Sequence, residues 1–178
     1  MNYSIKYLES FTEGLKNPIY EIAGKELLPS EFLTKLLELT KVVQSKKGRI
    51  FFFGNGASAS FANHMALDWS KNGGVLSLSL SDSALLTALS NDFSYEKAFK
   101  EFARINELGS NDIVATISSS GNSPNVVSVL DYANEVGAVS IALSGLKPDN
   151  KSRDKAKLSV YYPFKTYGMV ECAHQVYL

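Results

Sequence analysis

The chain has 178 residues, in which 18 Lys and Arg balance 18 Asp and Glu, and 45% of the residues are hydrophobic. This length suits one compact domain with a core of ordinary size. The balanced charge argues against a protein that binds nucleic acid by neutralising its phosphates, and Cys172, the single cysteine, excludes an intrachain disulfide and a cysteine zinc site. No apolar run approaches the roughly 18 residues of a membrane span, and residues 1–14 lack the apolar stretch of a signal peptide. We therefore expect a soluble, cytoplasmic domain with neither nucleic-acid nor membrane partners.

The first 48 residues are predicted to be a helical extension. Apolar side chains recur at helical spacing over residues 5–15, and Pro18 interrupts this helix or starts a further turn that runs to Gly24. A second helix begins at the N-cap Ser30 and ends in a Lys-Lys-Gly stop at residues 46–48. Both helices carry wide apolar stripes, so we expect the extension, residues 1–48, to pack on the domain or on another subunit.

From residue 49 onward the pattern alternates between short apolar runs and amphipathic segments. The apolar runs predict strands at residues 50–53, 75–80, 112–117, 138–143 and 158–162. The segments between and after them predict helices at residues 57–71, 84–89, 95–105, 124–136 and 168–178. This alternation predicts one α/β domain, residues 49–178, with an open parallel sheet of about five strands. Because no helix-ending signal follows the apolar residues 176–178, we expect the last helix to continue beyond Leu178 in the natural protein.

Two strand ends carry residues that suit an anion. The first predicted strand runs into Gly-Asn-Gly-Ala-Ser at residues 54–58, and the third runs into a hydroxyl-rich turn at residues 118–123. Each turn leads into a helix, whose N-terminal dipole favours negative charge, and serine hydroxyls add uncharged donors. Serine and glycine also make ordinary turns and caps, so the first turn alone leaves both interpretations open. The second turn holds four serines where capping needs only one, which favours a phosphate site.

These motifs resemble the sugar isomerase (SIS) domain family. The resemblance is carried by GNGASASFANH (residues 54–64), SNDF (residues 90–93) and ISSSGNSPNVV (residues 117–127), and it is greatest to the phosphoheptose isomerase branch. It implies a five-stranded parallel sheet between helices, in a three-layer, flavodoxin-like arrangement. It also implies a homotetramer or dimer with active sites at subunit interfaces. Phosphate-binding residues implied by the resemblance are Ser58, Ser118, Ser119, Ser120 and Ser123, and residues implied to line the sugar site are Asn55, Gly56 and Asp92.

Interconversion of a ketose and an aldose needs a base near the carbon and a donor near the oxygen. His64 and Asp68 share one face of the helix after the first turn, and Glu171 shares a face of the last helix with His174. In the resembled family, the position of Asp68 holds a Glu that is a proposed base, and that of Glu171 holds Gln. Glu171, Asp68 and His64 are therefore the candidate catalytic residues, with Glu171 as the base and Asp68 in support.

Simpler roles remain open for the same side chains. His64 and Asp68 could form a stabilising pair one helical turn apart, Glu171 and His174 could face solvent, and Asp92 could cap a helix. The motifs by themselves require no cofactor. Some members of the resembled family bind zinc through the positions of His64, Asp68 and Glu171, which implies a candidate zinc site here.

Three functions compete at this point. The first is an aldose–ketose isomerase that converts sedoheptulose 7-phosphate into a heptose 7-phosphate for lipopolysaccharide or capsule. The second is a non-catalytic SIS protein that senses a sugar phosphate or binds the replication initiator, and the third is a subunit whose serines only cap helices. Gly168 and Met169 stand where the resembled family has Asp and Arg, which indicates a different sugar phosphate or impaired catalysis. The retained His64, Asp68 and Glu171 favour the enzyme.

Overall fold

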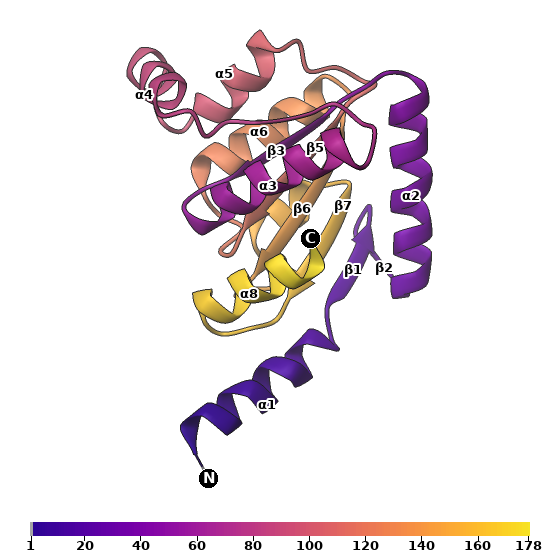
Figure 1. Cartoon of the computed structure of the whole chain (residues 1–178), viewed down its shortest axis with the longest axis vertical. Helices are drawn as coiled ribbons and strands as arrows, with labels where there is room; N and C mark the ends of the chain where they lie inside the picture. The colour runs from indigo at the N-terminus through magenta and orange to yellow at the C-terminus, as the bar shows by residue number, and fades with distance from the viewer. Residues whose placement is uncertain (1) are drawn as a thin grey trace.

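A computed structural model describes residues 2–178 as a mixed α/β domain around one seven-stranded sheet (Figure 1). The strands, in chain order, are β1 (Ile19–Ile22), β2 (Lys25–Leu27), β3 (Ile50–Gly54), β4 (Ser77–Ser79), β5 (Ile113–Ser118), β6 (Val139–Gly145) and β7 (Leu158–Tyr162). The five predicted strands correspond to β3–β7 and are all parallel, in the order β4-β3-β5-β6-β7. This is the strand order of flavodoxin-like sheets, in which ligands bind where the winding reverses. Here that point lies between the ends of β3 and β5.

The prediction of a five-stranded sheet and a wholly helical N-terminal segment is wrong in one respect. Residues 19–27 form an antiparallel hairpin, β1 and β2, and β1 pairs with β7 to extend the sheet to seven strands. The two turn residues, Ala23 and Gly24, have φ angles of 49° and 73°, as a tight hairpin turn with matching twist requires. Ile19 and Ile22 are β-branched and favour a strand, so the further helical turn after Pro18 does not form.

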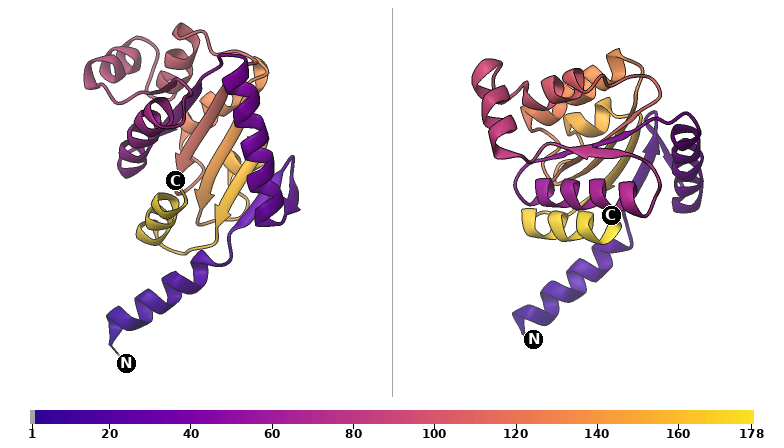
Figure 2. Two further views of the ribbon diagram at one scale, coloured as in Figure 1. Left: turned by 45° about the vertical axis from the view of Figure 1, so that its right-hand side comes forward. Right: turned by 45° about the horizontal axis from the view of Figure 1, so that its top comes forward.

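Residues 2–178 form eight helices, and most of them cover the two faces of the sheet. They are α1 (Tyr3–Leu15), α2 (Pro29–Ser45), α3 (Ala57–Lys71), α4 (Ser83–Asp92), α5 (Ala98–Ile105), α6 (Pro124–Glu135), α7 (Lys151–Lys155) and α8 (Tyr167–Tyr177). Side chains of α2, α3 and α8 join the core on one face, and side chains of α4, α5 and α6 join the core on the other. Helix α1 projects from the body (Figures 1 and 2). Within residues 2–178, no helix is both long and apolar enough to cross a membrane.

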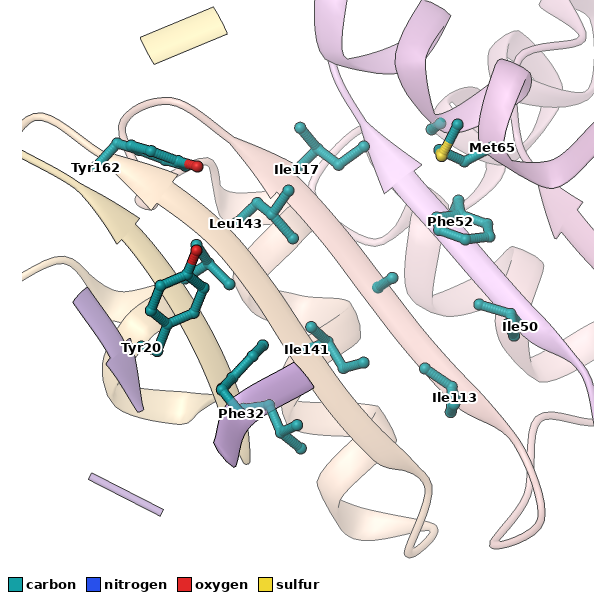
Figure 3. Close-up of a cluster of buried hydrophobic side chains, with 14 of the residues drawn as sticks. Tyr20, Phe32, Ile50, Phe52, Met65, Ile113, Ile117, Ile141, Leu143 and Tyr162 are labelled. Carbon is teal, nitrogen blue, oxygen red and sulfur yellow. The ribbon is translucent and has the colours of Figure 1, made fainter. Parts of the chain in front are cut away.

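Strand β3 shows how the short apolar runs divide between the two cores. Ile50 and Phe52 face the α2–α3–α8 side (Figure 3), whereas Phe51 and Phe53 face the other side. All four are buried, and Phe53 stacks on Phe99 of α5 with ring centroids 5.0 Å apart. Successive side chains of a strand point to opposite faces, so an unbroken apolar run fits a strand covered by helices on both sides.

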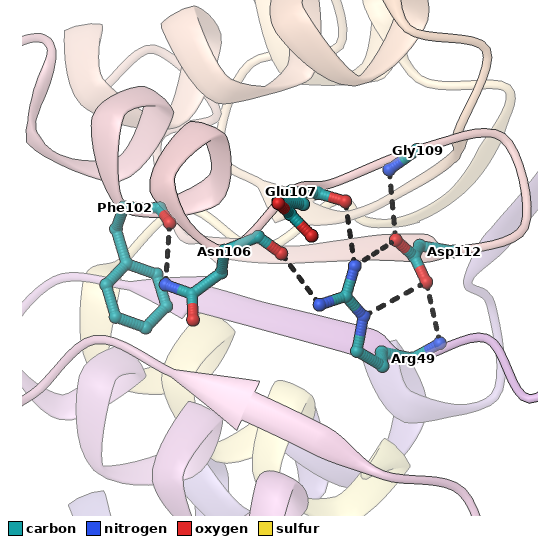
Figure 4. Close-up of polar contacts among 6 residues, drawn as sticks. All are labelled: Arg49, Phe102, Asn106, Glu107, Gly109 and Asp112. Carbon is teal, nitrogen blue, oxygen red and sulfur yellow. Dashed lines mark hydrogen bonds and ion pairs between the residues drawn. The ribbon is translucent and has the colours of Figure 1, made fainter.

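An ion pair fastens the opposite end of β3 to β5 (Figure 4). Asp112, whose side chain is 5% exposed, accepts hydrogen bonds from the backbone N–H of Arg49 (2.8 Å) and from Nη2 of the same residue (2.9 Å). It also accepts from the Gly109 N–H (3.0 Å), and the Arg49 guanidinium donates to the carbonyls of Asn106 and Glu107. The pair therefore fixes the register from which both strands run toward the site.

We predict that Asp112→Ala lowers the free energy of unfolding by about 3 kcal/mol, because removal of one partner leaves Arg49 largely buried without its counter-charge. Urea denaturation monitored by circular dichroism measures the loss. Lys35→Ala, which breaks the exposed Lys35–Glu38 pair, is the control and should leave the midpoint unchanged. An equal response of the two variants would contradict this account of the Arg49–Asp112 pair.

Candidate functional site

A cavity of about 130 Å³ lies where β3 and β5 end. It is formed by the β3–α3 turn, the β5–α6 turn and the start of α8. The lining residues are Asn55, Ser58, Ile117, Ser118, Ser119, Ser120, Ser123, Tyr167 and Glu171. The structure thus brings together all five serines that the sequence indicated, together with Asn55 and Glu171, in one space large enough for a phosphate group.

The β3–α3 turn places Ser58 at this cavity through two glycines. A Cβ on Gly54 would lie 2.5 Å from the Ser58 carbonyl oxygen, so α3 approaches the strand end closely only because this position is glycine. Gly56 has a φ of 58° and a ψ of −124°, a conformation that L-residues with a Cβ disfavour. Gly56 therefore shapes the turn and does not line the cavity. Ser58, in the first turn of α3, is 4% exposed.

The β5–α6 turn presents serine hydroxyls that few protein groups engage. Ser123 is the N-cap residue of α6, as predicted, but its side chain makes no capping hydrogen bond, and its Oγ lies 3.5 Å from Ser118 Oγ. Ser119 is 6% exposed, and its Oγ is buried without a hydrogen-bond partner among the described residues. A buried polar atom without a partner is costly and rare. Ser119 is also one of the residues that line the cavity.

The start of α7, which follows β6 in the chain, holds this turn through hydrogen bonds and close packing. The Ser152 N–H and hydroxyl both donate to the Gly121 carbonyl at 2.8 Å. The Lys151 N–H donates to Asn122 Oδ1 at 3.0 Å, and Asn150 packs so closely on Gly121 that a Cβ there would overlap its side chain. These contacts hold the turn in place without a ligand.

Three residues at or beside the site were not predicted from the sequence. Asn55 and Asn125 exchange side-chain amide hydrogen bonds of 3.0 and 2.9 Å, which join the two turns, and the Tyr95 hydroxyl donates to Asn55 Oδ1 at 2.8 Å. Tyr167 lines the cavity at the start of α8. The sequence held a weak indication that Asn125 has a role at the site, because asparagine is a poor helix former and yet stands in the first turn of a helix. It held no such indication for Tyr95 or Tyr167.

The cavity is unusual in its charge. Among the residues that line it within 2–178, Glu171 is the one carboxylate, and there is no Lys or Arg. Positive potential comes instead from hydroxyl donors and from the N-termini of α3 and α6, where Ser58 and the N-cap Ser123 line the cavity. Uncharged, fixed donors can hold an anion where the surroundings exclude water, since each hydrogen bond to a charged group is stronger than one to a neutral group.

The structure places the other predicted residues elsewhere. His64 Nε2 lies 3.1 Å from Asp68 Oδ2 on the outer face of α3, where their side chains are 62% and 39% exposed. Asp92 is the last residue of α4, exposed, and accepts a hydrogen bond from the Asn91 side chain. No cluster of three or more His, Cys, Asp or Glu side chains capable of holding a metal ion exists among residues 2–178. Glu171, His64 and Asp68 therefore do not lie together in one such cluster in this structure.

His174 is neither solvent-facing nor at the cavity. It is 0% exposed, and its Nε2 lies 3.3 Å from the carbonyl oxygen of Ser144 at the end of β6. The carbonyl can only accept, so Nε2 carries the proton, and Nδ1 is buried without a partner among the described residues. Burial lowers the pKa of His174 to about 4, opposed in part by the bond to Ser144. The imidazole is therefore neutral at pH 7.

Comparison with known proteins places these features in a family. The sequence model of a family described as the SIS domain matches residues 28–145. Phosphoheptose isomerase from Helicobacter pylori is 39% identical over 106 residues, which cover 56% of this chain and 54% of that protein. The enzyme of the same name from Solidesulfovibrio magneticus is 37% identical over 111 residues, covering 58% and 53%. The chain thus spans about half the length of these curated relatives.

A solved structure shows the same fold over nearly the whole chain. The structure of a phosphoheptose isomerase from Francisella tularensis superposes with a TM-score of 0.79 at 20% identity, and the match covers 99% of this chain and 94% of that one. At this identity the likeness shows the fold alone.

We predict that His174 makes the protein sensitive to acid. Below its ordinary pKa of 6.5 the unfolded chain binds a proton at His174 that the folded chain does not accept until about pH 4, so stability falls as the pH drops through this window. Since a tenfold change in proton affinity is worth about 1.4 kcal/mol, the loss is on the order of 3 kcal/mol. Urea unfolding of wild type and His174→Leu between pH 7 and pH 4 tests this, because the carboxylates contribute equally to both. A stability difference between the two proteins that stays constant with pH would contradict the prediction.

Proposed function

Because the chain belongs to the SIS domain family, we propose that it is a phosphosugar aldose–ketose isomerase. The proposed reaction converts sedoheptulose 7-phosphate into D-glycero-D-manno-heptose 7-phosphate, a precursor for lipopolysaccharide or capsule, in the cytoplasm. The observation that carries the proposal is a serine-lined cavity, with the buried hydroxyl of Ser119 left unpartnered, beside the carboxylate of Glu171. The names of the relatives support the choice of substrate.

The phosphate group of the substrate occupies the serine end of the cavity. Ser58 from α3 and Ser118–Ser120 and Ser123 from the β5–α6 turn donate to its oxygens, and the two helix N-termini offset its charge. Asn55, held by Asn125 and Tyr95, faces the sugar. This arrangement anchors the ester without a cation, so the remainder of the sugar extends toward α8.

Proton transfer is assigned to α8. The Glu171 carboxylate takes a proton from C1 of the ketose while the C2 carbonyl oxygen gains one, which gives an enediol. Return of the proton to C2, with loss of the O1 proton, yields the aldose with no net change in protons. Tyr167, one helical turn before Glu171, is the hydroxyl that α8 places at the same cavity to serve the oxygens. The exposed His64 and Asp68 take no part in this step within one chain.

Two further parts of the proposal concern assembly and the alternative function. A homotetramer or dimer is supported by α1, in which no residue from Tyr3 to Leu15 is buried and Tyr3 and Leu8 are 79% and 60% exposed. The alternative, a non-catalytic sugar-phosphate sensor, would need the serines but no base. Glu171 at the cavity supports the enzyme. Bound zinc would need ligands beyond one chain, so no step is assigned to it.

We expect Glu171→Gln to lower kcat about 10²–10⁴-fold while KM stays close to that of wild type, because the amide keeps the shape but cannot accept the proton. A coupled assay with sedoheptulose 7-phosphate measures both constants. Glu135→Gln, an exposed substitution at the end of α6, is the control for the loss of one negative charge. Binding of several sugar phosphates by wild type without turnover of any would favour the sensor.

We expect Ser119→Ala to abolish the rise in melting temperature that a sugar phosphate produces. A ligand at one hundred times its Kd stabilises wild type by about 2.7 kcal/mol, whereas the variant lacks a donor to the phosphate. The melting temperature without ligand should not fall, because the hydroxyl that is removed has no partner. Differential scanning fluorimetry measures the melting temperature without ligand and its rise with sedoheptulose 7-phosphate or with inorganic phosphate. Ser128→Ala on α6 serves as control. If Ser119→Ala kept the full ligand shift, the serines would act only as caps and turn formers.

A further inference from the structure

Helix α8 contacts the end of β6 through two residues one helical turn apart. Val170 packs on Gly145 so closely that a Cβ at Gly145 would lie 2.6 Å from its methyl groups. His174, four residues later and on the same face of α8, lies with Nε2 3.3 Å from the Ser144 carbonyl oxygen. Glu171 follows Val170 directly, so it is turned about 100° around the helix axis from this contact face, where it borders the cavity. The place of Glu171 is thus set by how α8 sits on Ser144 and Gly145.

The same two residues of β6 contact the phosphate-binding turn on their other side. The Gly145 N–H donates to the Ser119 carbonyl oxygen at 3.1 Å. Ser144 Oγ accepts from Asn150 Nδ2 at 3.2 Å, and Asn150 packs on Gly121 of the turn. The end of β6 is therefore a shared base that fixes the serines on one side and α8 on the other.

His174 supplies the one directional contact between α8 and this base. The apolar Val170–Gly145 contact stops α8 from moving closer to β6 but does not stop it from sliding along the strand. A hydrogen bond to a strand carbonyl fixes both the position of α8 along β6 and its rotation about its own axis. The imidazole is wholly buried and meets the Tyr162 ring edge-on with centroids 6.2 Å apart. It does not line the cavity, so it cannot exchange a proton with a substrate there.

We propose that His174 is a positioning residue for the isomerisation: its Nε2–H bond to the Ser144 carbonyl holds Glu171 at the correct distance from the phosphate-binding turn. The proposal rests on the function proposed above and names the group that aligns its base. The turn itself is held by Asn150 and Ser152, so phosphate binding does not depend on His174. A displacement of about 1 Å at a reacting group can cost about a hundredfold in rate, which is the scale of effect expected.

The test compares His174→Leu, which fills the space without a donor, with His174→Gln, whose amide N–H can still reach the carbonyl. Val43→Ala, a core truncation on α2 remote from the cavity, is the control for lost stability alone. For each protein, kcat and KM are measured with sedoheptulose 7-phosphate, and the thermal shift is measured with inorganic phosphate. Crystal structures of wild type and His174→Leu with phosphate locate the Glu171 carboxylate relative to the phosphorus atom.

The expected result is a kcat roughly tenfold to a hundredfold lower for His174→Leu, an unchanged phosphate shift and a Glu171 carboxylate displaced by about 1 Å. His174→Gln should recover most of the lost kcat, and Val43→Ala should lower the melting temperature without lowering kcat. The proposal is overturned if His174→Leu has the same kcat as Val43→Ala. It is also overturned if His174→Leu loses the thermal shift with phosphate, or if the Glu171 carboxylate stays at its wild-type position in the crystal structure. Should wild type turn over no sugar phosphate, the proposed function fails, and the crystal structures still decide whether His174 positions Glu171.

Discussion

In the proposed function, the site must bind a doubly charged ester with groups that carry no formal charge, and the rest of the site depends on this constraint. Lysine or arginine can follow a misplaced anion, because their side chains are long and their attraction acts in all directions. Serine hydroxyls and helix N-termini cannot, because a hydrogen bond weakens steeply with distance and angle. A site built from them binds an anion only if the turns that present them are held in place before binding. Fixed donor positions therefore do here what positively charged side chains do in other sites.

The structure supplies that rigidity from several directions. Gly54 lets α3 approach the end of β3, the reciprocal amide bonds of Asn55 and Asn125 join the two turns across the reversal point of the sheet, and Ser152 holds the second turn from behind. None of these contacts needs a ligand. The Ser119 hydroxyl is left without a hydrogen-bond partner among the described residues in this arrangement.

The sequence predicted those parts of the fold whose signals are local. Helix α3 has the predicted range of residues 57–71 and β7 that of residues 158–162, since Gly73 and Gly74 stop the helix and a short apolar run before Pro163 marks the strand. The meeting of the two serine turns could be predicted because parallel strands end at one edge of the sheet. The hairpin at Ile19–Leu27 was missed because Pro18 resembles a helix start, and the pairing with β7 that stabilises β1 lies more than a hundred residues away. The burial of His174 was missed because helical spacing does not reveal which face meets β6.

The residues proposed to bind the phosphate and those proposed to move protons lie on different elements, and this bears on which substrates are accepted. The serines and Asn55 belong to turns at the ends of β3 and β5, whereas Glu171 and Tyr167 belong to α8, which packs on the end of β6 and against α3. Gly168 and Met169 bring no charge to the start of α8, and Glu171 is the one charged residue that lines the cavity within residues 2–178, so in the proposed function the sugar hydroxyls are distinguished by shape and hydrogen bonding. A site that hydrogen-bonds substrate hydroxyls rejects analogues that lack them, because its own polar groups are then left unpaired. Discrimination among sugar phosphates should therefore follow the position of their hydroxyl groups along α8 more than the position of their phosphate.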